Sequence, residues 1–358
     1  MKLDILKQTA KKLIILFVLL GINAYSVPAQ NLKEYEYPRG NYRVMFYNVE
    51  NLFDTYNDSL KRDDDFTPQG QYYWSNRKYN DKLEKISKVI IGLGQWELPE
   101  IVGVCEIENL RVLQDLISKT PLEGSPYGII HKESPDSRGI DVGFLYRKDR
   151  FTPIEYEAVP IKFPFDGRTT RDILRVKGRF NSGDTVHFFV NHWPSRWGGQ
   201  KETDRKRIFA AEVLKRKTDS LFRNDINPNI IIMGDFNDYP ENTSLKDTLQ
   251  ALFNFDNPQP DKLYNLSYYI QENQAIGSHK YQGEWGVLDQ MIVSGNLLKK
   301  EATLKTAPEN NHIFNAPFLL EKDEKYVGYT TNRMYIGFKY HGGYADHLPV
   351  YLDLKINK

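Results

Sequence analysis

The sequence predicts an α/β fold, because short apolar runs typical of buried strands alternate with segments of helical periodicity. Residues 230–235 form an apolar run that ends on Asp235, and residues 101–106 form a second run that ends on Glu106. Residues 79–93 place apolar side chains three and four positions apart, as an amphipathic helix does. We therefore expect buried strands that release polar side chains at their carboxyl ends, with helices between them.

The first 29 residues have the pattern of a secretory signal peptide. Four lysines precede an apolar segment at residues 13–22, and the small residues Val27-Pro28-Ala29 follow it. An uncleaved membrane anchor is the alternative, but this apolar segment is too short to cross a bilayer comfortably. We expect cleavage before Gln30 and export of the mature protein to the periplasm or the extracellular space.

The rest of the chain is predicted to be one catalytic domain over residues 42–358, after a polar lead-in at residues 30–41. Cys105 is the only cysteine among 358 residues, so the core is expected to hold without disulfides. Cleavage of the signal removes four lysines and one aspartate, and the formal net charge falls from +1 to −2. This balance excludes a global basic surface, so binding of a polyanion has to be local.

Residues 42–50 are predicted to form the first strand of this domain. Asn48 and Glu50 lie two positions apart near its end, so their side chains are expected to point to the same face. A polar face on an edge strand is the alternative explanation. Glu106 at the end of the second strand would be costly to bury without a cation or hydrogen-bond donors beside it. Another helix is expected from Glu108 onward.

The middle of the chain is predicted to be rich in strands, at residues 140–146, 151–159, 172–180 and 185–190, followed by a helix at residues 202–221. The first two of these strands are interpreted as neighbours across a short turn. The fourth strand leads into His192, which precedes a Trp-Pro step and is not explained by turn chemistry. A lone histidine is nevertheless more often structural than catalytic.

Asp235 and Asn237 lie two positions apart where the apolar run of residues 230–235 ends. A carboxylate and a carboxamide that point the same way suit the handling of a metal ion or a phosphate group. A strand that runs into an Asx-stabilised turn is the alternative on this motif alone.

Further polar residues interrupt apolar sequence toward the C-terminus. Residues 285–294 are interpreted as a strand with Asp289 in its middle, and this carboxylate is expected to need a hydrogen-bond partner, most naturally a histidine. Asp346 and His347 form a pair at the head of the final strand. Residues 296–340 are interpreted as irregular.

These polar residues share one property, which is their position at the ends of apolar strands: Asn48, Glu50, Glu106, His192, Asp235, Asn237, Asp289, Asp346 and His347. Oxygen ligands dominate, which favours Mg²⁺ or Mn²⁺ over Zn²⁺. A hard cation beside histidine acid and base groups suits hydrolysis of a phosphate ester. One such residue is easily structural, whereas six strand ends with the same bias are not.

Six segments carry a family resemblance, in order over about residues 42–354: Tyr47-Asn48-Val49-Glu50, Cys105-Glu106, Val190-Asn191-His192, Gly234-Asp235-Phe236-Asn237, Leu288-Asp289 and Ala345-Asp346-His347-Leu348-Pro349. The chain resembles the endonuclease/exonuclease/phosphatase family, which includes deoxyribonucleases, apurinic endonucleases, sphingomyelinases and inositol polyphosphate 5-phosphatases. The resemblance implies a four-layer α/β sandwich, in which two mixed β-sheets pack face to face with helices on the outside.

The resemblance also implies a metal site of oxygen ligands at the top of the sandwich. Glu106 would be the principal ligand, with Glu50, Asn48 and Asp346 near the ion. Mg²⁺ is the expected cofactor, and Mn²⁺ and Ca²⁺ remain possible on the same ligands.

The catalytic roles implied by the resemblance fall on five residues. Asp235 would orient or deprotonate the attacking water, and Asn237 would hold the scissile phosphate. His347, paired with Asp289, would donate to a phosphate oxygen or act as the general acid or base, and His192 would contact the phosphate from the opposite side.

The substrate is predicted less closely than the chemistry. Asn191, Arg196 and Arg138 are the candidate substrate-binding residues. Apurinic endonucleases generally have a tyrosine where this chain has His192, whereas the deoxyribonuclease, sphingomyelinase and phosphatase branches have a histidine. Among these branches, a deoxyribonuclease-like enzyme that cleaves nucleic acid is the preferred prediction. A phosphatase or a sphingomyelinase-like lipid phosphodiesterase on the same scaffold is the alternative. No protein partner is predicted, and we expect a monomer.

Overall fold

The computed structural model describes residues 40–225 and 227–357, which belong to a compact unit with bounds Glu36–Lys358. The predicted signal peptide at residues 1–29, and all but the last two residues of the lead-in at 30–41, lie outside the described residues. Among the helices of the described residues, none is long and apolar enough to cross a membrane.

Two large mixed β-sheets form the centre of the described structure, which confirms the predicted fold class. The first sheet has the order β14 (Leu304–Lys305), β20 (Val350–Ile356), β1 (Tyr42–Leu52), β2 (Ile101–Ile107), β4 (Asp141–Arg147) and β3 (Tyr127–His131), with β15 (Asn311–Ile313) also paired to β20. The second has the order β5 (Phe151–Val159), β6 (Ile173–Phe180), β7 (Thr185–His192), β8 (Ile230–Asp235), β13 (Asp289–Ser294), β10 (Leu263–Asn265) and β9 (Ala251–Leu252).

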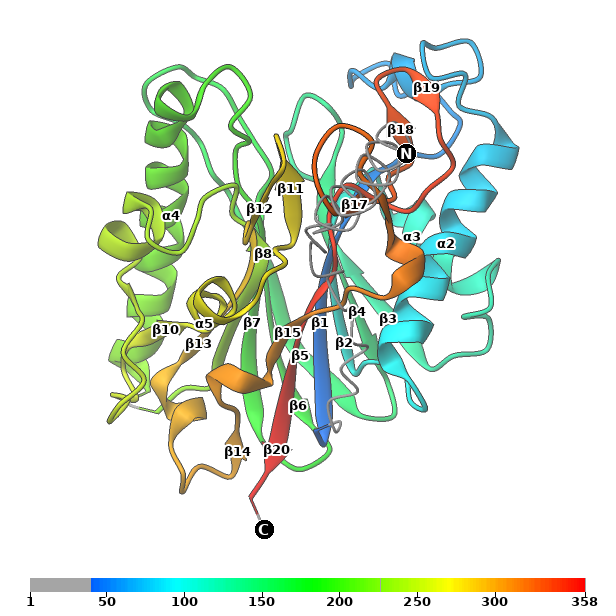
Figure 1. Ribbon diagram of the computed structural model, residues 1–358. Coiled ribbons are helices and arrows are strands. Elements are labelled where there is room, and N and C mark those ends of the chain that lie inside the picture. The colour runs from blue at the N-terminus through cyan, green and yellow to red at the C-terminus, as the bar shows by residue number, and fades with distance from the viewer. Residues whose placement is uncertain (1–39, 226, 358) are drawn as a thin grey trace, which may run out of the picture. The chain divides into compact units, whose positions relative to one another are not determined.

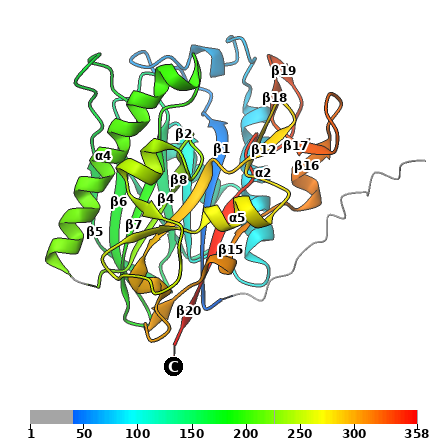
Figure 2. The same ribbon diagram turned by 60° about the vertical axis from the view of Figure 1, so that its left-hand side comes forward.

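The helices lie on the outer faces of the two sheets (Figures 1 and 2). The α-helices are α2 (Asn76–Gly94), α3 (Leu110–Ser118), α4 (Gln200–Asn224) and α5 (Ser267–Asn273). The helices α2 and α3 pack beside the first sheet, and α4 covers the second sheet over an apolar cluster that includes Phe189, Leu214 and Ile232. This arrangement buries the inner faces of both sheets against each other, so β1 and β2 read as nearly continuous apolar runs.

Glycines at the centre of the sheets permit close packing where a side chain would collide. A Cβ atom on Gly103 of β2 would lie 2.9 Å from the Met233 sulfur of the opposite sheet. A Cβ atom on Gly234 of β8 would lie 2.5 Å from the Asn191 carbonyl oxygen of the adjacent strand. The backbone contact at Gly234 requires glycine immediately before Asp235, whereas the contact at Gly103 is with the flexible end of Met233, which would have to shift to admit a side chain.

The strands β4 and β5 belong to different sheets, which corrects the prediction that they are neighbours. The turn between them carries the chain from the first sheet to the second, and β5 pairs with β6 instead. Phe151 at the start of β5 packs on Phe144 and Phe188, which lie in opposite sheets. Burial of this aromatic cluster between the sheets favours the crossing over a local hairpin.

The C-terminal third is more ordered than the sequence predicted. Residues 285–294 do not form one strand, because the chain breaks after β12 (Glu284–Gly286) and Asp289 begins β13. The region from residue 296 to 340 contains short strands and helical turns, and three small hairpins project from residues 279–340. Their strands are β11 (His279–Tyr281) with β12, β16 (Leu320–Lys322) with β17 (Tyr329–Thr331), and β18 (Tyr335–Ile336) with β19 (Lys339–Tyr340).

An ion pair inside the first sheet joins β1 to β20. The guanidinium of Arg43 donates from Nε and Nη2 to the two carboxylate oxygens of Asp353, at 2.8 Å each, and both side chains are buried. The Arg43 side chain also donates to the Leu93 carbonyl oxygen at the end of α2. Such a pair fixes how β1 enters the sheet, since neither charge has access to water.

We expect Asp353→Asn to lower the free energy of unfolding by about 3 to 5 kcal/mol, because Arg43 would stay buried without its counter-charge. Urea denaturation monitored by tryptophan fluorescence measures this change. The control is Glu212→Gln, which removes the exposed partner of Arg216 on α4 and should cost less than about 1 kcal/mol. Equal losses in the two variants would contradict a structural role for the buried pair.

Candidate active site

Strand register places three of the predicted residues in one row. His192 at the end of β7 is the register partner of Asp235 at the end of the parallel strand β8. Asp289 at the start of β13 is the partner of Asp235 on the other side, because β13 runs antiparallel to β8. The ends of β1 and β2 face this row from the other sheet, since Asn48 of β1 donates to Asp235.

Four residues at these strand ends have unusual backbone conformations. The φ angles are 51° for Glu50, 57° for Asn51, 60° for Glu106 and 52° for Asn237. Non-glycine residues rarely adopt such angles, and each costs on the order of 1–3 kcal/mol. The β1–β2 and β2–β4 registers also shift beside Glu50 and Glu106, as β-bulges do. These bulges re-aim the two carboxylates, so simple alternation along the strand does not describe where they point.

His347 and Asp289 form a buried hydrogen bond of 2.6 Å between Nδ1 and Oδ2, which confirms the predicted histidine partner for Asp289. Burial alone would lower the pKa of His347, but the carboxylates of Asp289 and Asp235 raise this pKa well above its ordinary value. These two carboxylates therefore favour the charged form of His347, whose Nε2 lies 3.8 Å from Asp235.

Asp235 is held at both carboxylate oxygens. Its Oδ1 accepts from the backbone N–H of Asn237 at 2.9 Å, and its Oδ2 accepts from the Asn48 side chain at 3.0 Å. Burial raises the pKa of Asp235 to about 7, with His347 opposing this rise and Asp289 adding to it. The Asn48 amide oxygen in turn accepts from the Glu50 N–H, so Asn48 positions its neighbours from within the site.

His192 is the second histidine of the row, and its charge state differs from that of His347. Its Nε2 lies 3.8 Å from both Glu106 and Asp235, and its buried Nδ1 has no hydrogen-bond partner among the described residues. Burial, and then the cations Arg171 and Arg138, hold the pKa of His192 well below its ordinary value. His192 is therefore neutral where His347 is charged.

A group of carboxylates lies beside this row. The guanidinium of Arg333 bridges Glu50 and Asp346 at distances of 2.6 and 3.0 Å. Burial, and then repulsion from Asp346, raise the pKa of Glu50 to about 7. Burial would also raise the pKa of Asp346, but the neighbouring cations, led by Arg333, lower it. Buried Lys82 adds positive charge nearby, and burial lowers its own pKa to about 8.

Glu106 lies at the end of β2. It contacts both the segment that carries Glu50 and the side chain of His192. Its Oε2 accepts from the Asn51 N–H at 3.0 Å and lies 3.9 Å from the Arg138 guanidinium. Its Oε1 faces His192. Glu106 therefore has the polar surroundings that the sequence predicted a carboxylate at this position would need.

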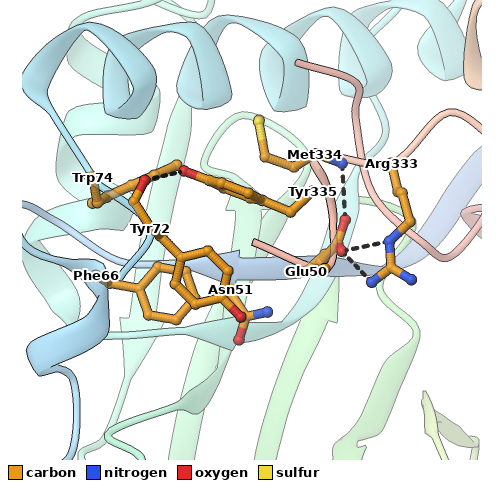
Figure 3. Close-up of a pocket in the computed structure, with 9 residues that line it drawn as sticks. Glu50, Asn51, Phe66, Tyr72, Trp74, Arg333, Met334 and Tyr335 are labelled. Carbon is orange, nitrogen blue, oxygen red and sulfur yellow. Dashed lines mark hydrogen bonds and ion pairs between the residues drawn. The ribbon is translucent and has the colours of Figure 1, made fainter. Parts of the chain in front are cut away.

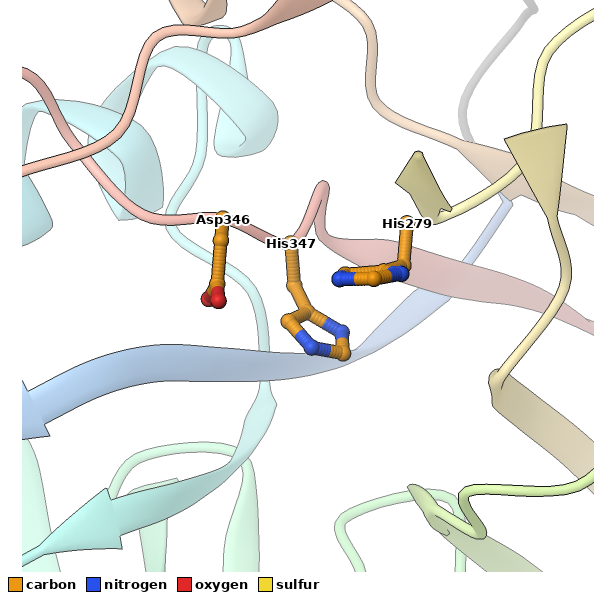
Figure 4. Close-up of side chains that lie close together, drawn as sticks. All are labelled: His279, Asp346 and His347. Carbon is orange, nitrogen blue, oxygen red and sulfur yellow. The ribbon is translucent and has the colours of Figure 1, made fainter. Parts of the chain in front are cut away.

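In the described part of the chain, three clusters of His and carboxylate residues bring their ligand atoms within 4.8 Å of one another: His279 with Asp346 and His347, Asp235 with Asp289 and His347, and His131 with Glu133 and Asp141. Figure 4 shows the first cluster, with Asp346 and His347 on the segment before β20 and His279 on β11. None of the three joins Glu50, Glu106 and Asp346, and Arg333 bridges the first and last of these.

The predicted ligands nevertheless fit a hard divalent cation. Glu50, Glu106 and Asp346 offer carboxylate oxygens, which Mg²⁺, Mn²⁺ and Ca²⁺ prefer. Burial, and then repulsion from Asp346, disfavour the charged form of Glu50 and raise its pKa to about 7. A cation bound beside these carboxylates would favour the charged form.

Comparison with protein families decides the classification. The family model described as "Endonuclease/Exonuclease/phosphatase family" matches residues 43–356, which is most of the chain. The chain belongs to the endonuclease/exonuclease/phosphatase family. Members of this family are phosphoesterase hydrolases and are typically metal-dependent. Comparison with curated protein sequences gives no significant match.

Solved structures of endonuclease/exonuclease/phosphatase proteins share the fold at low sequence identity. The human Nocturnin catalytic domain is 15% identical with a TM-score of 0.52, over 88% of this chain and 94% of that chain. Zebrafish (D. rerio) TDP2, complexed with single-strand DNA product, is 13% identical with a TM-score of 0.53, over 88% and 98%. A mannosyl-6-phosphatase from Bacteroides thetaiotaomicron is 17% identical with a TM-score of 0.50, over 87% and 99%.

The three predicted substrate-binding residues differ in their exposure and in their hydrogen-bond partners. Arg138 is half-exposed and donates to the Asn51 side chain at 2.8 Å beside Glu106, so it remains a candidate for substrate contact. Asn191 is fully buried, and its amide bonds to backbone carbonyls and to the Trp193 indole N–H. This geometry does not favour substrate binding by Asn191, and we assign it a structural position.

Arg196 also has a structural position, because its side chain hydrogen-bonds to the loop after β8. Its Nε donates to the Asn237 carbonyl oxygen at 2.7 Å, and its Nη2 contacts Asp238 and Asn242. The Asn237 amide donates to the Trp193 carbonyl oxygen at 3.0 Å. Arg196 therefore holds Asn237 in its left-handed conformation, and substrate binding by Arg196 is not favoured.

Four residues of the site escaped the sequence analysis: Asn51, Lys82, His279 and Arg333. Asn51 directly follows a predicted motif, so its position was a usable signal. The His279 ring packs at a tilt against the His347 ring, with centroids 4.7 Å apart, and burial lowers the pKa of His279 to about 4. His279 and Arg333 come from segments without strong periodicity, and no pattern in the sequence marks them.

We expect Asp289→Asn to lower the pKa of His347, because the carboxylate is the main group that raises it. A histidine whose pKa is raised by folding stabilises the folded state. This stabilisation is fully present below the unfolded pKa of about 6.5 and is lost as pH rises through the folded pKa. The variant should therefore lose more stability at pH 6 than at high pH. NMR titration of the His347 ring and urea denaturation at both pH values measure these effects.

The matched control is Glu321→Gln, which removes a carboxylate from the less buried His341 and leaves the His347 environment intact. An unchanged His347 titration in Asp289→Asn would contradict the assigned pairing.

Proposed function

We propose that this protein is a divalent-metal-dependent phosphoesterase that cleaves phosphodiester bonds in nucleic acid. The observation that carries this proposal is the meeting of Asp235, His192 and the His347–Asp289 pair at one edge, beside Glu50, Glu106 and Asp346. This arrangement combines oxygen ligands for a cation with two histidines in different charge states. It suits attack of water on a phosphate group, whose transition state gathers negative charge on oxygen.

Asp235 is placed to orient the attacking water and accept its proton. Hydrogen bonds from Asn48 and Asn237 fix the carboxylate, and a pKa near 7 suits a general base at neutral pH. His347 holds a proton at Nε2 that it can donate to a phosphate oxygen. Asp289 keeps this proton available, because its carboxylate stabilises the imidazolium.

His192 and Asn237 would contact the phosphate as neutral hydrogen-bonding groups. His192 is neutral and offers one ring nitrogen as a hydrogen-bond donor or acceptor. Glu50, Glu106 and Asp346 would hold the cation, which supplies Lewis-acid stabilisation of the phosphate oxygens when it is bound. We propose Mg²⁺ as this ion, from the oxygen character of the ligands.

Nucleic acid is the proposed substrate on two grounds. One similar structure, zebrafish TDP2, was solved with single-strand DNA product, and the histidine at position 192 is compatible with the deoxyribonuclease branch as well as with the phosphatase and sphingomyelinase branches. Arg138 is half-exposed beside Glu106, so it is available to a backbone phosphate.

A small sugar phosphate is the second candidate substrate. It is favoured by a pocket of about 310 Å³ beside Glu50, which is within the size range of small-molecule pockets. The similar Bacteroides protein that is titled a mannosyl-6-phosphatase agrees with this alternative.

We expect the mature protein to cleave plasmid DNA or RNA with Mg²⁺ and to lose this activity in EDTA. The panel should also contain hexose 6-phosphates and sphingomyelin, which test the phosphatase and lipid alternatives under the same conditions. Gel electrophoresis and release of phosphate or phosphocholine measure the products. Intact nucleic acid beside a cleaved phosphomonoester would replace the proposed substrate, and an inert panel would reject the enzyme class.

Variants separate the activity of this chain from that of a contaminant. His192→Ala and Asp235→Asn should each lower kcat by about 10²- to 10⁴-fold, the range for removal of an acid or base group. Circular dichroism checks that both variants are folded. Retention of full activity in both would overturn the site assignment.

We propose that the protein is exported, because residues 1–29 have the lysine-rich start, apolar segment and small-residue site of a signal peptide. Expression of the full chain in a bacterial host should yield a product that begins at Gln30 outside the cytoplasm. N-terminal sequencing of the fractions tests this, and a product that keeps residue 1 in the cytoplasm would refute it.

A further inference from the structure

A pocket lies beside the candidate active site. Two segments form it, and no function was predicted for either from the sequence. One is the loop between β1 and α2, and the other is the segment that forms the β18–β19 hairpin. The residues that line it define what we call the aromatic pocket: Glu50, Asn51, Phe66, Tyr72, Trp74, Arg333, Met334, Tyr335 and Gly337. Figure 3 shows the aromatic side chains on one side and Glu50 with Arg333 on the other.

The aromatic side of this pocket is pre-formed by contacts within the chain. Phe66 stacks between Phe53 and Tyr72, with centroid distances of 4.4 and 4.6 Å. Tyr335 meets Tyr72 edge-on at 4.7 Å, and its hydroxyl donates to the Tyr72 carbonyl oxygen at 2.9 Å. The buried Trp74 indole donates to the Phe53 carbonyl oxygen. A ligand therefore meets a rigid wall and does not have to order it on binding.

Several polar groups of the pocket have no partner within the described part of the chain. The Asn51 amide uses its oxygen to accept from Arg138, and its Nδ2 donors make no hydrogen bond. The Tyr72 hydroxyl also makes none, and neither does Nη1 of Arg333. Glu50 supplies an acceptor at the boundary with the active site. The pocket thus offers donors, an acceptor and ring edges within a small volume.

These groups fit a hydroxyl-bearing ring better than a flat base. Both faces of Phe66 are already covered and Trp74 is buried, so these rings have no free face on which a nucleobase can stack. Aromatic edges carry partial positive charge and attract hydroxyl oxygens. Hydroxyl groups both donate and accept, which matches Asn51, Tyr72 and Glu50 together. The volume of about 310 Å³ is at the lower limit for ligand pockets, so one ring fits and a chain of them does not.

We infer that the aromatic pocket binds the sugar ring that carries the reacting phosphate. This inference rests on the proposed phosphoesterase function, because Glu50 belongs to both the pocket and the predicted metal site. Tyr72 and Asn51 contact the sugar hydroxyls, and the phosphate extends past Glu50 toward Asp235 and His347. The ring comes from a hexose phosphate or from the sugar of a nucleotide, and both present hydroxyl or ether oxygens.

The test compares esters with and without a sugar. For each variant, kcat/KM is measured on glucose 6-phosphate, on the p-nitrophenyl ester of thymidine 5′-phosphate and on p-nitrophenyl phosphate. Tyr72→Phe removes one hydroxyl, and Asn51→Asp replaces a donor with an acceptor while keeping a residue that tolerates positive φ. Each should lower the ratio of sugar-bearing to sugar-free kcat/KM by about three- to tenfold, the effect of one hydrogen bond.

The matched controls are Tyr73→Phe and Asn57→Asp, which make the same chemical changes at exposed positions outside the pocket. Both should leave the ratio unchanged. A larger fall with glucose 6-phosphate identifies a hexose phosphate as the source of the ring, and a larger fall with the thymidine ester identifies a nucleotide. An unchanged ratio on both esters in Tyr72→Phe and Asn51→Asp overturns the inference.

A binding measurement separates this inference from the proposed activity. Saturation-transfer NMR with glucose 6-phosphate and thymidine 5′-monophosphate in EDTA needs no hydrolysis. Transfer to the sugar protons that weakens in Tyr72→Phe, but not in Tyr73→Phe, supports the pocket even if no ester is cleaved. Absence of transfer in a protein that hydrolyses p-nitrophenyl phosphate rejects the pocket and leaves the phosphoesterase function standing.

Discussion

The register of β7, β8 and β13 is the constraint on which the site depends. Asp235 is paired with His192 on one side and with Asp289 on the other, so three functional side chains are set by backbone hydrogen bonds of a buried sheet. A slip of one residue would exchange the faces of every side chain in a strand and is opposed by the whole core. The first sheet joins this frame through the hydrogen bond from Asn48 of β1 to Asp235.

The electrostatic surroundings shift the pKa values of the two histidines in opposite directions. His192 and His347 each place Nε2 3.8 Å from Asp235, yet burial beside arginines lowers the pKa of the first and two carboxylates raise the pKa of the second. Environments that push the pKa values of similar residues apart are typical of acid–base sites. Arg333 and Lys82 partly balance the carboxylates at Glu50 and Asp346, so this negative charge is tolerated within the fold.

The sequence was most informative where apolar runs end on polar residues. The strands β2 and β8 were predicted from their continuous apolar runs, which are buried in the structure. The isolated Asp289 carboxylate correctly predicted a histidine partner. It was least informative where tertiary packing decides. The crossing from β4 to β5 follows from the aromatic cluster around Phe151, which no local pattern encodes. The place of Arg333 depends on a segment of short hairpins that lack both helical and strand periodicity.

Cys105 gives the protein an internal reporter of local opening. Its thiol is fully buried in β2, one residue before Glu106, and its register partner in β1 is Asn48. Burial raises the pKa of this thiol well above its ordinary value, which suppresses the reactive thiolate. An alkylating reagent can therefore reach it only when these catalytic strands separate. Because the chain has no other cysteine, the labelling rate of Cys105 would measure the stability of the strands that frame the candidate site apart from that of the loops around it.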